Sequence, residues 1–168
     1  PVAHLRRLYD EALAVEDVEG LAVGTRPDCV DGEKLDLLQG YAENRLIWIE
    51  YGLQSAHDRT LTRINRGHDF KAFQQAVEAT QNRGIAICAH VILGLPGETR
   101  EDMLETAKIL SRMGIDGLKL HLLYVIRGTE MEKQYRDGTY TCLTMPEYAD
   151  LVCEFLACIP KNVVIQRL

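Results

Sequence analysis

The sequence predicts an α/β protein in which helices cover a parallel sheet, arranged as an open, partial (β/α) barrel of the TIM type. Short apolar runs alternate with amphipathic helical stretches along the whole chain, which is the pattern of repeated βα units. The apolar runs are nearly continuous, as in strands that are buried on both faces. Five such runs occur, fewer than the eight strands of a closed barrel, so we expect one partial-barrel domain over residues 1–168.

The elements follow from these patterns in chain order. The predicted strands are residues 20–25, 46–53, 85–93, 117–126 and 163–166. The predicted helices are residues 2–16, a stretch from about 35 to 44, residues 57–65, a stretch from 70 closed by Gly84, a stretch from Thr99 to Gly114, residues 129–137 and a stretch from 144 to about 159. Thr144 and Glu147 form a capping box at the start of the last helix.

Composition narrows the function classes. The formal net charge of −6 argues against a general nucleic-acid binder, although Arg59, Arg63 and Arg66 form a local basic cluster. No apolar run approaches the roughly 20 residues that span a bilayer, and no signal peptide is visible. The chain starts without Met and ends within a strand-like run, so we expect it to be a segment of a longer protein.

The cysteines indicate a reducing compartment. Their odd number of five and their spacings match neither a disulfide framework nor a zinc motif. Cys88 lies inside an apolar strand, where it is expected to act as a small buried hydrophobe. A cytoplasmic location fits these thiols best.

One strand-to-helix turn is the strongest local signal. The run from Val91 ends abruptly at a Gly-x-Pro-Gly turn, and a helix begins at Thr99. The carboxyl ends of parallel strands are where α/β proteins bind ligands. Gly94 and Gly97 would let the backbone approach such a ligand closely.

Polar residues also stand at or near the carboxyl ends of the predicted strands, at the same edge. They are Thr25 with Arg26, Glu50 with Gln54 and Ser55, Arg66, His90, and His121 with Tyr124. A turn, a helix cap or a satisfied core histidine would explain each of them singly, and their shared edge favours a site. The Gln54 amide can both donate and accept hydrogen bonds, and the Arg66 guanidinium suits a carboxylate, so an amino-acid-like or nucleoside ligand is expected.

Three pieces of sequence together resemble the radical S-adenosylmethionine (SAM) enzymes. They are Gly52-Leu53-Gln54-Ser55, Ile64-Asn65-Arg66-Gly67-His68 and Ile92-Leu93-Gly94-Leu95-Pro96-Gly97-Glu98-Thr99, in this order and spacing. The similarity is to the branch with Elp3-like, MiaB-like and NifB-like proteins and the oxygen-independent coproporphyrinogen oxidases, and within it to a bacterial YhcC-like group. It covers essentially the whole chain.

The resemblance implies SAM as a cofactor and gives roles to residues of this chain. Gln54 and Arg66 match residues that bind the methionyl portion of SAM. Ile92 would contact adenine through its backbone, and Gly94 would permit close approach. His90 and Thr25 stand at or near positions where some relatives carry an acidic residue that contacts the ligand.

The resemblance also implies a 4Fe–4S cluster held by Cys-x3-Cys-x2-Cys, a spacing that this chain lacks. The cluster ligands are therefore expected outside these residues, and the chain alone is expected to be inactive. The full-length protein would cleave SAM reductively to a 5′-deoxyadenosyl radical, with flavodoxin or ferredoxin as reductant and an unassigned substrate.

Two other functions are compatible with the residues. Glu50, His90 and His121 fall on three predicted strands and could hold a divalent cation in a metal-dependent hydrolase or isomerase. A non-catalytic, RNA-associated scaffold is the other alternative, although the acidic charge disfavours direct nucleic-acid binding.

Overall fold

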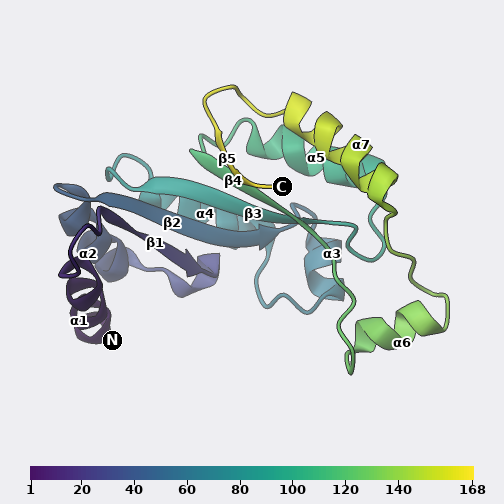
Figure 1. Ribbon diagram of the computed structural model, residues 1–168, viewed down its shortest axis with the longest axis horizontal. Coiled ribbons are helices and arrows are strands. Elements are labelled where there is room, and N and C mark those ends of the chain that lie inside the picture. Colours follow the sequence, from purple (N-terminus) through teal and green to yellow (C-terminus); the bar gives the residue numbers. More distant parts are fainter.

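Five parallel strands form one sheet in the order β1-β2-β3-β4-β5 in the computed structural model, which describes residues 1–168 (Figure 1). The strands are β1 Gly20–Thr25, β2 Leu46–Gln54, β3 Ala86–Leu93, β4 Gly117–Leu122 and β5 Val164–Arg167. Strands that are consecutive in sequence are neighbours in space, with helices in each connection, as in a (β/α) barrel. β1 and β5 do not pair with each other, so the barrel is open. The predicted fold class is confirmed.

The helices occupy the expected places. They are α1 Val2–Leu13, α2 Gly32–Ala42, α3 Asp58–Arg63, α4 Phe70–Thr80, α5 Arg100–Leu110, α6 Glu130–Arg136 and α7 Met145–Ala157, with a short 3₁₀ turn η1 at Pro27–Cys29. The capping box of Thr144 and Glu147 on α7 is confirmed, and Thr99 and Asp102 form a second one on α5. None of the helices is both long and apolar enough to cross a bilayer.

Several predicted boundaries are wrong. α1 ends at Leu13 and not at residue 16, and α5 ends at Leu110 and not at Gly114. β4 ends at Leu122, whereas the apolar pattern extended it to residue 126. The neighbouring strand β3 ends at Leu93, whose carbonyl accepts from the Leu123 N–H at 3.1 Å. Beyond Leu123 there is no strand with which the backbone of residues 124–126 could pair. Gly84 does not directly follow α4, because the helix ends at Thr80 and the first left-handed residue beyond it is Asn82, with φ of 63°.

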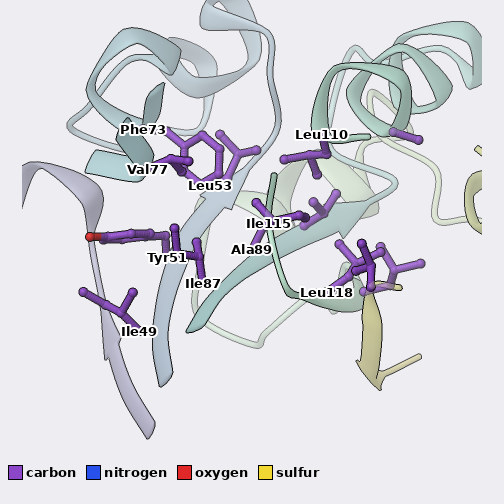
Figure 2. Close-up of a cluster of buried hydrophobic side chains, with 14 of the residues drawn as sticks. Ile49, Tyr51, Leu53, Phe73, Val77, Ile87, Ala89, Leu110, Ile115 and Leu118 are labelled. Carbon is purple, nitrogen blue, oxygen red and sulfur yellow. The ribbon is translucent and has the colours of Figure 1, made fainter. Parts of the chain in front are cut away.

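The hydrophobic core lies between one face of the sheet and the helices. Alternate side chains of β2 and β3, including Tyr51, Leu53 and Ile87, are almost fully buried against Phe73 of α4 and Leu110 of α5 (Figure 2). This packing fixes which side of each strand is left for polar groups.

The opposite side of the sheet, here called the inner face, carries polar residues. Strand register sets Glu50 beside Cys88, Gly52 beside His90, His90 beside Lys119 and Ile92 beside His121. The inner face is defined by these residues: Glu50, Gly52, Cys88, His90, Ile92, Lys119 and His121. Its carboxyl-terminal edge is where the predicted site residues gather.

Candidate functional site

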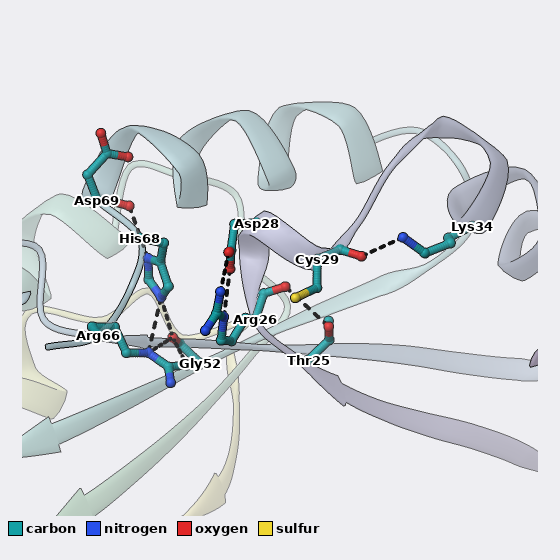
Figure 3. Close-up of polar contacts among 9 residues, drawn as sticks. All are labelled: Thr25, Arg26, Asp28, Cys29, Lys34, Gly52, Arg66, His68 and Asp69. Carbon is teal, nitrogen blue, oxygen red and sulfur yellow. Dashed lines mark hydrogen bonds and ion pairs between the residues drawn. The ribbon is translucent and has the colours of Figure 1, made fainter. Parts of the chain in front are cut away.

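Arg66 lies against the backbone at the end of β2. It follows α3 and reaches back so that its Nε and Nη2 atoms donate to the Gly52 carbonyl at 3.2 and 2.7 Å. The Nε2 atom of His68 lies 3.1 Å from Arg66 Nε and 3.2 Å from the same carbonyl (Figure 3). Burial lowers the pKa of Arg66, and the nearby Arg26 lowers it further. None of the ion pairs of the chain includes Arg66, so its charge is available to an anionic ligand.

Gly52 makes the space in which Arg66 and Gln54 meet. A Cβ atom at Gly52 would lie 2.4 Å from Arg66 Nη2 and 2.8 Å from Gln54 Nε2. Gln54 has a φ of 74°, unusual for a residue with a side chain, and the register between β2 and β3 shifts at this point. Such bulges often redirect a side chain next to a ligand site. The structure therefore brings together the two residues expected to bind the methionyl end of SAM.

Ile92 and His90 lie beside Gln54. The three residues line one open hollow of about 380 Å³, together with His121 and Tyr124. Ile92 also lines a second hollow of about 440 Å³, whose other walls include Leu95 and Pro96. The inner face at the end of β3 thus connects the Gln54 side of the site to a more apolar space.

Gly94 is held by contacts within the chain. Its N–H donates to Met103 Sδ at 3.2 Å, and its carbonyl accepts the Tyr140 hydroxyl at 2.8 Å. A Cβ atom there would lie 3.2 Å from Leu143, and the φ of 86° favours glycine. These contacts account for the glycine by packing, and its role toward a ligand stays a prediction.

Thr25 is not brought together with the other predicted site residues. It lies on the helix side of β1 in a hollow that Tyr9, Val23 and Ile49 also line. Its hydroxyl donates to the carbonyl of Arg26 at 3.2 Å. Arg26 instead reaches toward Gly67, where a Cβ atom would meet its guanidinium at 3.2 Å.

Glu50 joins three strands on the inner face. Its carboxylate accepts from Lys119 Nζ at 2.7 and 2.6 Å and from His90 Nε2 at 2.9 Å. Burial raises the pKa of Glu50, but the bonds from Lys119 and His90 outweigh burial and leave that pKa below its ordinary value. The ring centroids of His90 and His121 are 5.3 Å apart, and His121 Nε2 is buried without a hydrogen-bond partner.

This arrangement does not support a metal site at Glu50, His90 and His121. The residues are neighbours, but Lys119 holds the carboxylate that a cation would need. No three His, Cys, Asp or Glu side chains of the chain are grouped so that they could bind a metal ion. The five cysteines are free thiols, and no three of them lie close enough together to bind a metal ion or an iron–sulfur cluster.

Two residues of the site, Gly52 and His68, contribute contacts that the sequence did not predict. Gly52 stands two positions before Gln54, and His68 two positions after Arg66. Side chains alternate along β2, so the sequence is sufficient to place Gly52 on the same face of the strand as Gln54. The contact of His68 with the Gly52 carbonyl depends on the loop path after α3, which periodicity does not show.

The comparison with family models decides the family. The model of the radical SAM superfamily matches residues 2–110, and that of the Radical_SAM C-terminal domain matches residues 115–168. The chain belongs to the radical SAM superfamily. The boundary between the two matches falls between α5 and β4, across which the sheet is continuous.

Relatives place this radical SAM chain in the Elp3- and YhcC-like branch. An uncharacterized protein of Methanocaldococcus jannaschii is 47% identical over 169 residues, covering 100% of this chain and 52% of that protein. YhcC of Escherichia coli is 40% identical over 165 residues, 98% of this chain and 53% of YhcC. Elongator complex protein 3 of Schizosaccharomyces pombe is 31% identical over 153 residues, 89% of this chain and 27% of that protein. The chain thus spans about half the length of the first two relatives.

A solved structure shows the same fold. Elp3 of the archaeon Methanocaldococcus infernus, with an N-terminal deletion, superimposes with a TM-score of 0.78 at 24% sequence identity. The match covers 89% of this chain and 35% of that one. The radical SAM chain therefore shares the partial-barrel architecture of this branch.

Proposed function

We propose that this chain forms the SAM-binding part of a radical SAM enzyme. The observation that carries the proposal is the convergence of Arg66 and Gln54 on Gly52, at the carboxyl-terminal edge of the sheet. A half-buried guanidinium without a carboxylate partner, next to an amide that can donate and accept, suits the zwitterionic end of an amino acid.

The residues of the site divide between the two ends of the cofactor. Arg66 and Gln54 would hold the carboxylate and amino groups of the methionyl portion, and His68 supports Arg66 through the shared Gly52 carbonyl. Ile92 would contact adenine, with His90 lining the hollow between the two ends. When bound next to a reduced 4Fe–4S cluster, SAM supplies a 5′-deoxyadenosyl radical. Gly94 and Thr25 belong to the proposed site on the resemblance alone.

The iron–sulfur cluster does not fit the cysteines of this chain. They neither have the required spacing nor cluster in space. We therefore propose that the cluster ligands lie elsewhere in the full-length protein and that these residues alone do not catalyse the reaction. A cytoplasmic reductant such as flavodoxin or ferredoxin belongs to the same proposal, which leaves the substrate unassigned.

Calorimetry on the full-length protein, purified anaerobically with its cluster reconstituted, tests the site. Gln54→Ala is expected to weaken SAM binding about 10-fold, because hydrogen bonds to charged groups are lost. Gln74→Ala, on the exposed side of α4, is the matched control and is expected to bind as the wild type does. Equal affinity in the two variants, or no binding by the wild type, would refute the proposed site.

A further inference from the structure

Gln54 and Ile92 of the proposed site lie at the ends of two strands, and buried polar groups join the loops that follow these strands. The β2–α3 loop begins after Gln54, and the β3–α5 loop begins after Leu93. The Ser55 hydroxyl donates to the carboxylate of Glu98, which is 43 positions away in sequence. Ser55 is only 1% exposed, so water does not compete for this bond.

The direction of the Ser55 bond is fixed by its second contact. The His57 backbone N–H donates to Ser55 Oγ at 3.1 Å, which leaves the hydroxyl proton for Glu98. Burial raises the pKa of Glu98, while hydrogen bonds from Ser55 and then Thr60 lower it. Thr60 lies in α3, the helix that leads to Arg66. Glu98 therefore contacts both the loop after Gln54 and the helix before Arg66.

Further bonds between the same segments run through the backbone. The Ala56 N–H donates to Thr106 Oγ1 at 3.2 Å, and His57 Nε2 lies 2.8 Å from the Asp102 carbonyl. Both partners belong to α5. Among these contacts, only the one with Glu98 connects the turn after Ile92 itself to the Gln54 side.

We propose that Glu98 is a positioning residue that fixes the separation between the methionyl and adenine ends of the SAM site. This inference rests on the proposed function. Glu98 would touch neither end of the ligand, and it would hold the two loops in one arrangement before binding. Preorganisation of this kind increases the affinity of a ligand that spans both loops, and not that of a ligand that occupies only one.

Ligands of two lengths distinguish this role from general support of the fold. S-adenosylhomocysteine spans both ends, whereas 5′-methylthioadenosine lacks the amino-acid group. The experiment uses the full-length protein with its cluster reconstituted. Glu98→Ala is expected to lower the affinity for S-adenosylhomocysteine about 10-fold and the affinity for 5′-methylthioadenosine less than about 2-fold. Glu98→Gln keeps an oxygen that accepts from Ser55 and is expected to restore affinity to within about 3-fold of the wild type.

Controls keep the outcomes separate. Glu105 is exposed on α5, and Glu105→Ala is expected to leave the affinities for S-adenosylhomocysteine and 5′-methylthioadenosine unchanged. Ser55→Ala removes the same bond from the other loop and is used if Glu98→Ala does not fold, with the same selective loss expected. Equal loss for both ligands, or no loss for either, would overturn the role of Glu98. Binding of neither ligand by the wild type would contradict the proposed SAM site itself, and the inference with it.

Discussion

At the scale of single residues, the site depends on one small residue as much as on the charged ones. The pairing of Gln54 with Arg66 was predictable, because glutamine and arginine side chains at the ends of elements suit an amino-acid ligand. The role of Gly52 was not assigned, since it depends on how Arg66 returns to β2 after α3. Gly94 is packed against Leu143, which is a reason for a glycine that the sequence did not suggest, and its role toward a ligand stays a prediction.

A methyl group at Gly52 tests this geometry. Gly52→Ala places its Cβ where Arg66 Nη2 and Gln54 Nε2 lie, so both side chains must move. We expect SAM affinity of the full-length protein to fall about 10-fold, as when charge-assisted hydrogen bonds are lost. Gly24→Ala is the matched control, because nothing lies within 4 Å of its Cβ position. Undiminished affinity in Gly52→Ala would show that this space is not part of the site.

The planar shape of Arg66 gives a second test. Arg66→Lys keeps the charge but loses the fork that donates to Gly52 through two nitrogens. SAM affinity, measured by calorimetry, is expected to fall about 10-fold or more. Arg112→Lys, at an exposed position, provides the comparison. A lysine at position 66 that binds SAM as the arginine does would mean that only charge is required.

At the scale of elements, Glu50 links three strands of the inner face. The sequence predicts β2, β3 and β4, because each strand is an almost continuous run of hydrophobic residues. It could not predict the bonds from Lys119 to Glu50, which join residues 69 positions apart and depend on strand register. Nor could it predict the register shift at Gln54 or the end of β4 at Leu122, since both are set by the neighbouring strand.

The histidines of the inner face predict how stability depends on pH. Burial lowers the pKa of His121, and the nearby His90, Arg167 and Lys119 lower it further, outweighing Glu50. A histidine whose folded pKa is lowered binds protons more readily when unfolded, so stability is lost as pH falls below about 6.5. The free energy of unfolding is measured with urea at pH 7.5 and at pH 5.5. Its decrease from pH 7.5 to pH 5.5 is expected to be smaller for His121→Gln than for the wild type.

The control for this experiment is His4→Gln, exposed on α1. His121 Nε2 has no hydrogen-bond partner, so the substitution breaks no bond at that atom. An identical loss of stability in the wild type and in His121→Gln would exclude this histidine as a source of the pH dependence.

At the scale of the whole molecule, the helices and the hydrophobic core define one side of an open barrel. Alternating strands and helices were sufficient to predict this class. The inner face carries Glu50, Lys119 and the two histidines, none of which belongs to the hydrophobic core. The proposed SAM residues lie at the carboxyl-terminal edge of this face.

The most direct test of the central claim is the formation of 5′-deoxyadenosine. The full-length protein, reconstituted with iron and sulfide and reduced with dithionite, is incubated with SAM and the product is quantified by chromatography. We expect 5′-deoxyadenosine from the wild type and at least about 10-fold less from the Gln54→Ala, Arg66→Ala double variant. No product above that of a variant without its cluster cysteines, or equal product from wild type and double variant, would contradict the account.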